Sequence, residues 1–160
     1  MKRRRELELA YRAHGPSVLR RARAILGNEA EAQEVLQDLF AGFAADPSAL
    51  LDARSRVAFL YQATTHRCLN TIRNGRNRRR LIDARACELA PVRNDTAPEP
   101  RVLAHDMLLR LDEDTAKAAI FYFVDGMTHA EIAELLGCSR RHVGNLLQRL
   151  PAATAATESP

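Results

Sequence analysis

Residues 128–150 constrain the fold more than any other stretch of this chain. Thr128 and Glu131 have the spacing of a capping box, in which each side chain bonds the other residue's backbone amide at a helix start. The apolar residues that follow predict a short helix, and Gly137 stands where a left-handed residue would end it. Ser139 is placed to cap a second helix. Two short helices joined by a tight turn predict a helix-turn-helix.

The second of these helices has two contrasting faces. Its apolar stripe is Val143, Leu146, Leu147 and Leu150, and the opposite face carries Arg141, Gly144, Asn145 and Gln148, with no acid among them. Guanidinium and amide groups pair with phosphates and base edges. This composition favours a DNA-binding motif over the alternative, an αα-hairpin in an unrelated helical domain.

The composition predicts an all-α protein. The 160 residues are 46% hydrophobic with no Trp, and Val and Ile are sparse beside Ala, Leu and Arg, which favour helices. Apolar periodicity predicts helices over 6–26, 29–44, from 57 into an Arg cluster, 102–111 and about 112–124, besides the two of the helix-turn-helix. The Gly15-Pro16 pair predicts either a break in the first helix or two helices.

A region without periodicity divides the chain. Residues 85–100 contain three prolines and predict a mobile linker. We therefore expect two small helical domains, at 1–84 and 102–151, joined by a flexible linker at 85–101. The second would be a four-helix domain ending in the helix-turn-helix. Pro151 should stop the last helix, and residues 152–160 should be disordered.

The helix that begins near residue 57 carries a polar stripe. Gln62, His66, Asn70 and Arg73 are spaced by four, four and three residues and so share one face. The stripe runs into an Arg cluster, and five Arg lie between 73 and 80: Arg73, Arg76, Arg78, Arg79 and Arg80. An Arg-rich helix end could simply complement the helix dipole, but five exceed that need. A nucleic-acid surface is the favoured interpretation.

The distribution of charge supports this interpretation. The net charge is only +4, yet residues 67–85 hold seven Arg against one Asp, whereas acids outnumber bases from 88 to 114. A basic block of this kind suits a polyanion. The helix over 29–44 has an acidic outer face that includes Glu34, Gln37 and Asp38, although an ordinary surface helix would look the same.

The cysteines and the N-terminus indicate no special chemistry. Cys68, Cys87 and Cys138 are odd in number and form no C-x-x-C motif, so neither a disulfide framework nor a zinc site is predicted, and we expect no cofactor. Cys68 and Cys138 should be small core residues, and Cys87 could be an exposed thiol. The basic N-terminus is followed by no apolar run, so we expect a cytoplasmic protein without membrane insertion.

Taken together, the motifs resemble a bacterial RNA polymerase sigma factor of the extracytoplasmic-function group. The resemblance covers roughly residues 5 to 150. It rests on the acidic helix E-A-Q-E-V-L-Q-D-L-F-A-G-F, then F-L-Y-Q-A-T-T-H-R-C-L-N-T-I-R running into R-N-R-R-R, a linker, and the helix-turn-helix. Sigma factors of this group carry only the second and fourth conserved domains. The order of the motifs is more specific than the helix-turn-helix alone.

The resemblance implies partners and site residues. Glu34, Gln37 and Asp38 would dock on core RNA polymerase, with Phe40 packing inward. The stripe of Gln62, His66, Asn70 and Arg73, with Arg76, Arg78, Arg79 and Arg80, would bind and open the minus-ten element of promoter DNA. The recognition helix would enter the major groove of the minus-thirty-five element through Ser139, Arg140, Arg141, His142, Gly144, Asn145, Gln148 and Arg149. Such factors are commonly controlled by an anti-sigma factor.

Some positions depart from the family pattern. His66 stands where Asn is frequent, so the base preference at the minus-ten element does not transfer. Gly144 and Asn145 replace a commoner Lys-Ser pair, and Leu146 stands where a basic residue is frequent. Fewer phosphate contacts from this helix would make upstream binding depend on Arg140, Arg141 and Arg149.

Other function classes fit the sequence less well. An enzyme is disfavoured because the chain has no Gly-rich phosphate loop, no nucleophile elbow and no metal-ligand spacing. The nearer rival is a stand-alone helix-turn-helix regulator that binds operator DNA without polymerase, but it leaves the Arg-rich N-terminal half unexplained. Two separate basic surfaces argue against an adaptor that binds no DNA.

Overall fold

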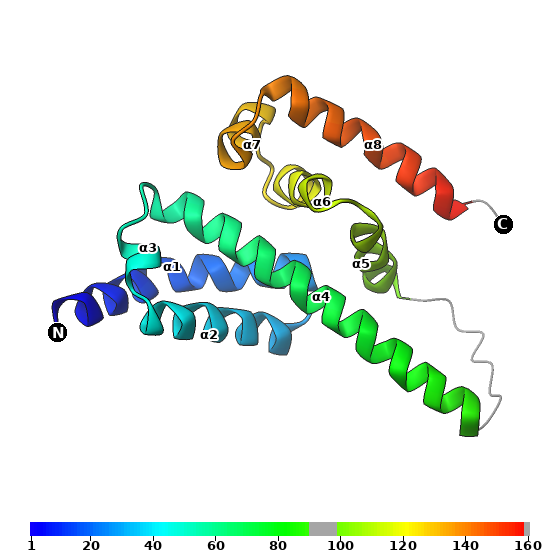
Figure 1. Ribbon diagram of the computed structural model, residues 1–160, viewed down its shortest axis with the longest axis horizontal. Helices are drawn as coiled ribbons and strands as arrows, with labels where there is room; N and C mark the ends of the chain where they lie inside the picture. The colour runs from blue at the N-terminus through cyan, green and yellow to red at the C-terminus, as the bar shows by residue number, and fades with distance from the viewer. Residues whose placement is uncertain (90–98, 159–160) are drawn as a thin grey trace.

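A computed structural model of the protein describes the backbone of residues 1–89 and 99–158 and the side chains of residues 1–85 and 99–150. The described residues form eight α-helices and one π-helix, with no strand among them, which confirms the expected all-α class. The helices lie in two groups. Helices α1 to α4 form the first group, and helices α5 to α8 lie along one side of the long helix α4 (Figure 1).

The first group is a bundle of α1 (Lys2–Leu26), α2 (Glu29–Ala45) and α4 (Arg56–Leu89), with the short α3 (Ser48–Leu51) between the last two. Gly27 ends α1 with φ 65°, and Asn28 caps α2 by accepting a hydrogen bond from the amide of Glu31. The apolar faces of the three long helices meet in one core, which includes Val18, Leu26, Val35, Leu39, Phe40, Leu60 and Leu69. Burial of these side chains fixes the orientation of α4 and so of its polar stripe.

Helix α1 is continuous, without the break that Gly15-Pro16 could have caused. Pro16 lacks an amide hydrogen and leaves one helical bond unmade. Buried residues on both sides of it, from Leu7 and Ala10 to Val18 and Ala22, pack into the same core. Tertiary packing therefore keeps the helix intact across the proline.

The second group consists of α5 (Pro100–Arg110), α6 (Glu113–Ala119), the π-helix η1 (Ile120–Val124), α7 (His129–Leu136) and α8 (Arg140–Glu158). Asp112 caps α6 by accepting from the amide of Thr115 at 3.1 Å. The capping box of α7 is formed, since the Glu131 amide donates to Thr128 and the Thr128 amide donates to the Glu131 carboxylate at 2.7 Å. The helix-turn-helix is confirmed.

The helix ends differ from the expectation in two places. Helix α4 continues to Leu89 and α5 begins at Pro100, so both ends of the expected linker are helical, and residues 90–98 lie outside the described residues. Residues 86–89 are Ala, Cys, Glu and Leu, none of which breaks a helix, and Pro is favoured at the first position of one. Helix α8 likewise runs past Pro151 to Glu158, because four alanines follow the proline and favour continuation.

The two groups of helices share a core. Ala116 of α6 and Ile120 of η1 belong to the same buried cluster as the residues of α1, α2 and α4, and Leu108, Leu109 and Leu111 pack against it. The helix-turn-helix has a second cluster of its own, formed by Ala118, Phe121, Ile132, Ala133, Val143 and Leu146. Tyr61 of α4 packs against this second cluster. The second group is therefore packed directly on the face of α4.

Candidate nucleic-acid interface

The outer face of α8 is open to solvent. Seven of the residues predicted to contact DNA are exposed, namely Ser139, Arg140, Arg141, His142, Asn145, Gln148 and Arg149, and Gly144 is half-buried. The opposite face is anchored by Val143 and Leu146, which are buried. Ser139 caps the helix by accepting from the His142 amide at 3.1 Å. Arg149 has one partner, Asp112, with 3.4 Å between Nη1 and Oδ1. The geometry thus leaves this face available to a ligand.

Two departures from the family pattern have a structural explanation. Leu146 is only 2% exposed, so it belongs to the core and replaces no phosphate contact on the outer face. A Cβ at Gly144 would meet nothing closer than Nδ1 of His129, at 4.0 Å. Packing within the protein therefore does not require glycine at this position, which leaves close approach of DNA to the backbone as a reason for it.

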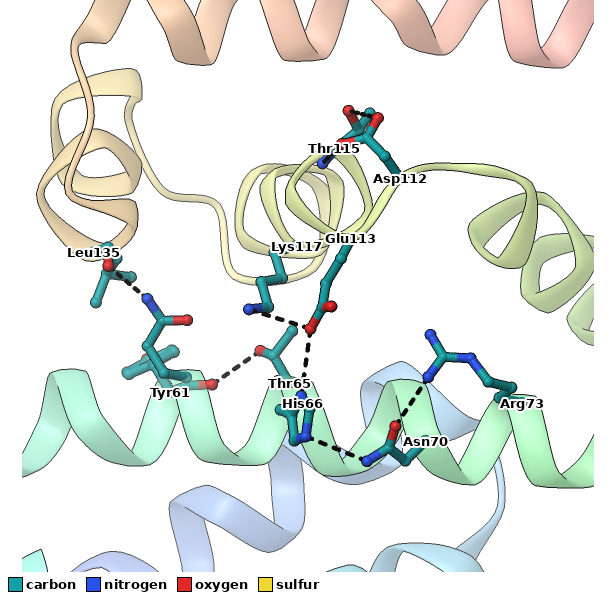
Figure 2. Close-up of polar contacts among 11 residues, drawn as sticks. Tyr61, Thr65, His66, Asn70, Arg73, Asp112, Glu113, Thr115, Lys117 and Leu135 are labelled. Atoms are coloured by element: carbon teal, nitrogen blue, oxygen red, sulfur yellow. Dashed lines mark hydrogen bonds and ion pairs between the residues drawn. The ribbon is translucent and has the colours of Figure 1, made fainter. Parts of the chain in front are cut away.

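The polar stripe of α4 is present and is linked by hydrogen bonds. The Arg73 guanidinium donates to the side-chain oxygen of Asn70 at 3.1 Å, and Nδ2 of Asn70 lies 3.3 Å from Nε2 of His66 (Figure 2). Gln62, two turns before Asn70, uses its amide group differently and donates to the backbone carbonyl of Leu135. The predicted periodicity is therefore correct, and the four side chains do share one face.

This face is covered in part by the second group of helices. Nδ1 of His66 lies 3.4 Å from the carboxylate of Glu113 at the start of α6, as Figure 2 shows, and Leu135 at the end of α7 accepts from Gln62. The pKa of Glu113 is lowered, first by the charge of Lys117 and then by its hydrogen bond with His66. Farther along α4, Nη2 of Arg79 lies 3.5 Å from Asp106.

The rest of the Arg cluster is more accessible. Arg73, Arg78 and Arg80 are exposed, whereas Arg76 and Arg79 are half-buried. The structure brings the eight predicted minus-ten residues onto one helix. Three of them contact the second group, namely Gln62, His66 and Arg79, although the His66 side chain stays 57% exposed. The others include Arg73, Arg78 and Arg80, which are exposed.

One polar centre was missed from the sequence. Arg21 of α1 and Asp125, which follows η1, form a buried ion pair with side chains 8% and 7% exposed. The pair is bidentate, with Nε to Oδ1 at 2.8 Å and Nη2 to Oδ2 at 2.7 Å. Arg21 lies in a run of basic residues and Asp125 precedes a glycine, so each looked like an ordinary surface charge. The two are 104 residues apart, and no local pattern connects them.

The acidic face of α2 is open to solvent. Glu34, Gln37 and Asp38 are exposed, while Phe40 is 8% exposed and packs edge-on against the ring of Tyr11, with 4.9 Å between ring centroids. The inward orientation expected for Phe40 is confirmed. The three polar residues form a compact surface on the outside of the first group.

The cysteines offer no reactive site within the described side chains. Cys68 is fully buried, and burial raises the pKa of its thiol to about 12. Cys138 is half-buried against the core of the helix-turn-helix. The side chain of Cys87 lies outside the described residues. Within the described ranges no group of three His, Cys, Asp or Glu side chains could hold a metal ion, and no helix has the length and apolarity needed to cross a membrane.

These features define a class of protein: two helical modules, each presenting a surface suited to nucleic acid. Comparison with known proteins is more specific. A family model described as Sigma-70 region 2 matches residues 10–79, and another described as Sigma-70, region 4 matches residues 101–150. The chain therefore belongs to the sigma-70 family. Such a factor directs RNA polymerase to promoters.

Comparison with solved structures supports the fold through CnrH. The structure of CnrH in complex with the cytosolic domain of CnrY has a TM-score of 0.52 and 21% identity, covering 98% of this chain and 91% of that one. The sigma factor RpoE in complex with the anti-sigma factor NepR from Bartonella quintana has a TM-score of 0.47 and 14% identity, covering 92% and 93%. No curated protein gave a match.

Proposed function

We propose that this sigma factor uses three separate surfaces. The acidic face of α2 docks on core polymerase through Glu34, Gln37 and Asp38. The stripe and Arg cluster of α4 bind and open the minus-ten element, and α8 reads the minus-thirty-five element from the major groove. The proposal treats residues 1–84 and 102–151 as the two functional domains and 85–101 as the connection between them. The protein acts by binding and not by catalysis, in the cytoplasm where polymerase is found.

The observation that carries this proposal is the pairing of two polar surfaces of different kinds. The outer face of α8 is a rigid, exposed helix surface with caps at its start, which suits a duplex groove. The α4 surface combines amide, imidazole and guanidinium groups, which suit unpaired bases and the backbone between them. A regulator that binds only an operator would need the first surface and not the second.

We further propose control in trans by an anti-sigma factor, as is common in the family. CnrH, which has the same fold, was solved with the cytosolic domain of CnrY bound. The test is whether a purified regulator, encoded by a gene next to the gene of this sigma factor, prevents the sigma factor from binding polymerase. Unchanged polymerase binding in the presence of every such regulator would contradict it.

The direct test of the function is gel filtration of the full chain with bacterial core RNA polymerase, without DNA and at moderate salt. The wild-type protein should co-elute as a stoichiometric complex. Asp38→Arg should weaken the complex by on the order of a hundredfold, because it places a positive charge against a basic partner surface. Glu8→Arg is the matched control, since Glu8 is an exposed acid on α1 that pairs with Arg12 one turn away. Equal binding by Asp38→Arg and Glu8→Arg would contradict the docking assignment.

A further inference from the structure

The two groups of helices are joined by one polar contact of unusual completeness. The Arg21 guanidinium makes two hydrogen bonds to the Asp125 carboxylate, one to the Tyr61 backbone carbonyl at 2.9 Å and one to the Thr65 hydroxyl at 2.6 Å. Its Cζ atom also lies 4.6 Å from the ring centroid of Tyr61 and 5.4 Å from that of Phe121. Four of the five guanidinium N–H groups therefore have an acceptor, and the charge also faces two aromatic rings.

The partners of Arg21 come from both groups of helices. Arg21, Tyr61 and Thr65 belong to the first group, whereas Asp125 and Phe121 belong to the second. If the groups separated, Arg21 would keep two partners on α4, but it would lose the carboxylate and the Phe121 ring. Asp125 would then return to water. The ion pair therefore contributes to closure of the two groups, together with the apolar contacts of Ala116 and Ile120 in the shared core.

Closure covers part of the surface assigned to the minus-ten element. Glu113 lies against His66, the carbonyl of Leu135 accepts from Gln62, and Asp106 lies near Arg79. Each of these groups supplies negative charge or an acceptor oxygen where a DNA phosphate or base would bind. The second group of helices thus places carboxylate and carbonyl oxygens on the α4 surface, where oxygens of the DNA would otherwise bind.

We propose that the Arg21–Asp125 pair is an interdomain latch that holds the free protein in a closed state, in which its own second domain masks the minus-ten surface. The inference rests on the assignment of the α4 stripe in the proposed function. The faces of α2 and α8 remain exposed in this state. Polymerase can therefore be engaged through α2 while α4 is still masked, and opening then releases the masked residues for DNA.

The latch can be tested on the full chain without polymerase. Asp125→Asn keeps the size of the side chain and removes its charge, and Asp114→Asn is the matched control, because Asp114 is an exposed acid near the start of α6. Small-angle X-ray scattering should give a larger radius of gyration for Asp125→Asn and an unchanged one for Asp114→Asn. Circular dichroism should show the same helix content in both.

A second readout measures masking. Binding of a fluorescently labelled, mixed-sequence single-stranded DNA should tighten by on the order of tenfold in Asp125→Asn, the range of typical coupling between sites. Adding Gln62→Ala and Arg79→Ala to Asp125→Asn should abolish the gain, because these two side chains contact the second group in the closed state. Glu113→Gln, at the exposed rim of the interface, should produce a smaller gain in the same direction, and it cannot be confused with a folding defect because Glu113 is exposed.

The outcomes separate the latch from the function. Identical scattering by Asp125→Asn and wild type would overturn the latch. An expanded Asp125→Asn protein with unchanged DNA affinity would overturn masking of the α4 surface. Neither result affects co-elution of the wild-type protein with core polymerase, whose absence would instead overturn the proposed function.

Discussion

The stripe of α4 and the outer face of α8 are both polar, basic helix surfaces, yet the structure treats them differently. Among the described side chains, the outer face of α8 makes one ion pair with the rest of its domain, between Arg149 and Asp112, and all its predicted DNA contacts except Gly144 are exposed. The α4 stripe is hydrogen-bonded along its length and is partly covered by α6 and α7. In the proposed function, the face assigned to duplex DNA is therefore free to bind, whereas the face assigned to single strands first has to separate from the second group.

The largest expected effect comes from removing the cation that closes the two domains. Arg21→Ala leaves the buried Asp125 carboxylate unpaired, which in a closed protein costs about 3–5 kcal/mol. Urea unfolding followed by circular dichroism should show a fall in the free energy of unfolding that approaches this range. The fall should be smaller if the domains open, because Asp125 would then be hydrated. Arg20→Ala is the control, since Arg20 is exposed beside Arg21. A loss of similar size in both variants would contradict the special role of Arg21.

The second prediction separates the two DNA surfaces. Arg141→Glu should weaken binding of holoenzyme to duplex promoter fragments by roughly tenfold or more, because one phosphate or base contact is lost and a repulsive charge replaces it. Replacing one cation should also reduce the salt dependence by about one unit of slope. Polymerase binding and single-stranded DNA binding by α4 should not change. An equal loss in all three assays would show that α8 is misassigned.

A third prediction concerns the stability of the helix-turn-helix. Thr128→Ala removes the hydroxyl that accepts from the Glu131 amide, so the start of α7 should lose about 1 kcal/mol. Hydrogen exchange should become faster in α7 and α8 and stay unchanged in α1 and α2. Faster exchange throughout the chain would mean that the two domains unfold as one unit.

The smallest effect is expected at Gly144. Gly144→Ala should stabilise α8 by about 0.5–1 kcal/mol, because alanine favours a helix and the new methyl group would have 4.0 Å to its nearest neighbour. If glycine is present to let DNA approach the backbone, the same variant should bind duplex promoter DNA less well. Greater stability together with unchanged DNA binding would remove that explanation.

The sequence predicted the elements that depend on neighbours in the chain. The capping box at Thr128, the left-handed Gly137 and the periodicity of Gln62, His66 and Asn70 are local, and each is found as expected. Helix ends near prolines were less predictable. Continuity across Pro16 depends on burial of residues on both sides of it, which no local rule contains.

The contacts between the domains could not be predicted in this way. Arg21 and Asp125 meet only because α1, α4 and η1 pack together, and the π-helix that presents Asp125 has no clear sequence signal. The hydrogen bond from Gln62 to the backbone carbonyl of Leu135 could not be predicted from the sequence for the same reason. Local patterns thus identified the two polar surfaces, but they did not show which side chains on them contact the other domain.

In the proposed latch, the two domains are closed in the free protein and separate when it binds polymerase. The most direct measurement is the distance between fluorophores on exposed positions of α2 and α8, by single-molecule energy transfer, in the free protein and in complex with core RNA polymerase. We expect a short distance in the free protein and a longer one in the complex, with Asp125→Asn shifted toward the longer distance before polymerase is added. The same distance in all three samples would contradict it.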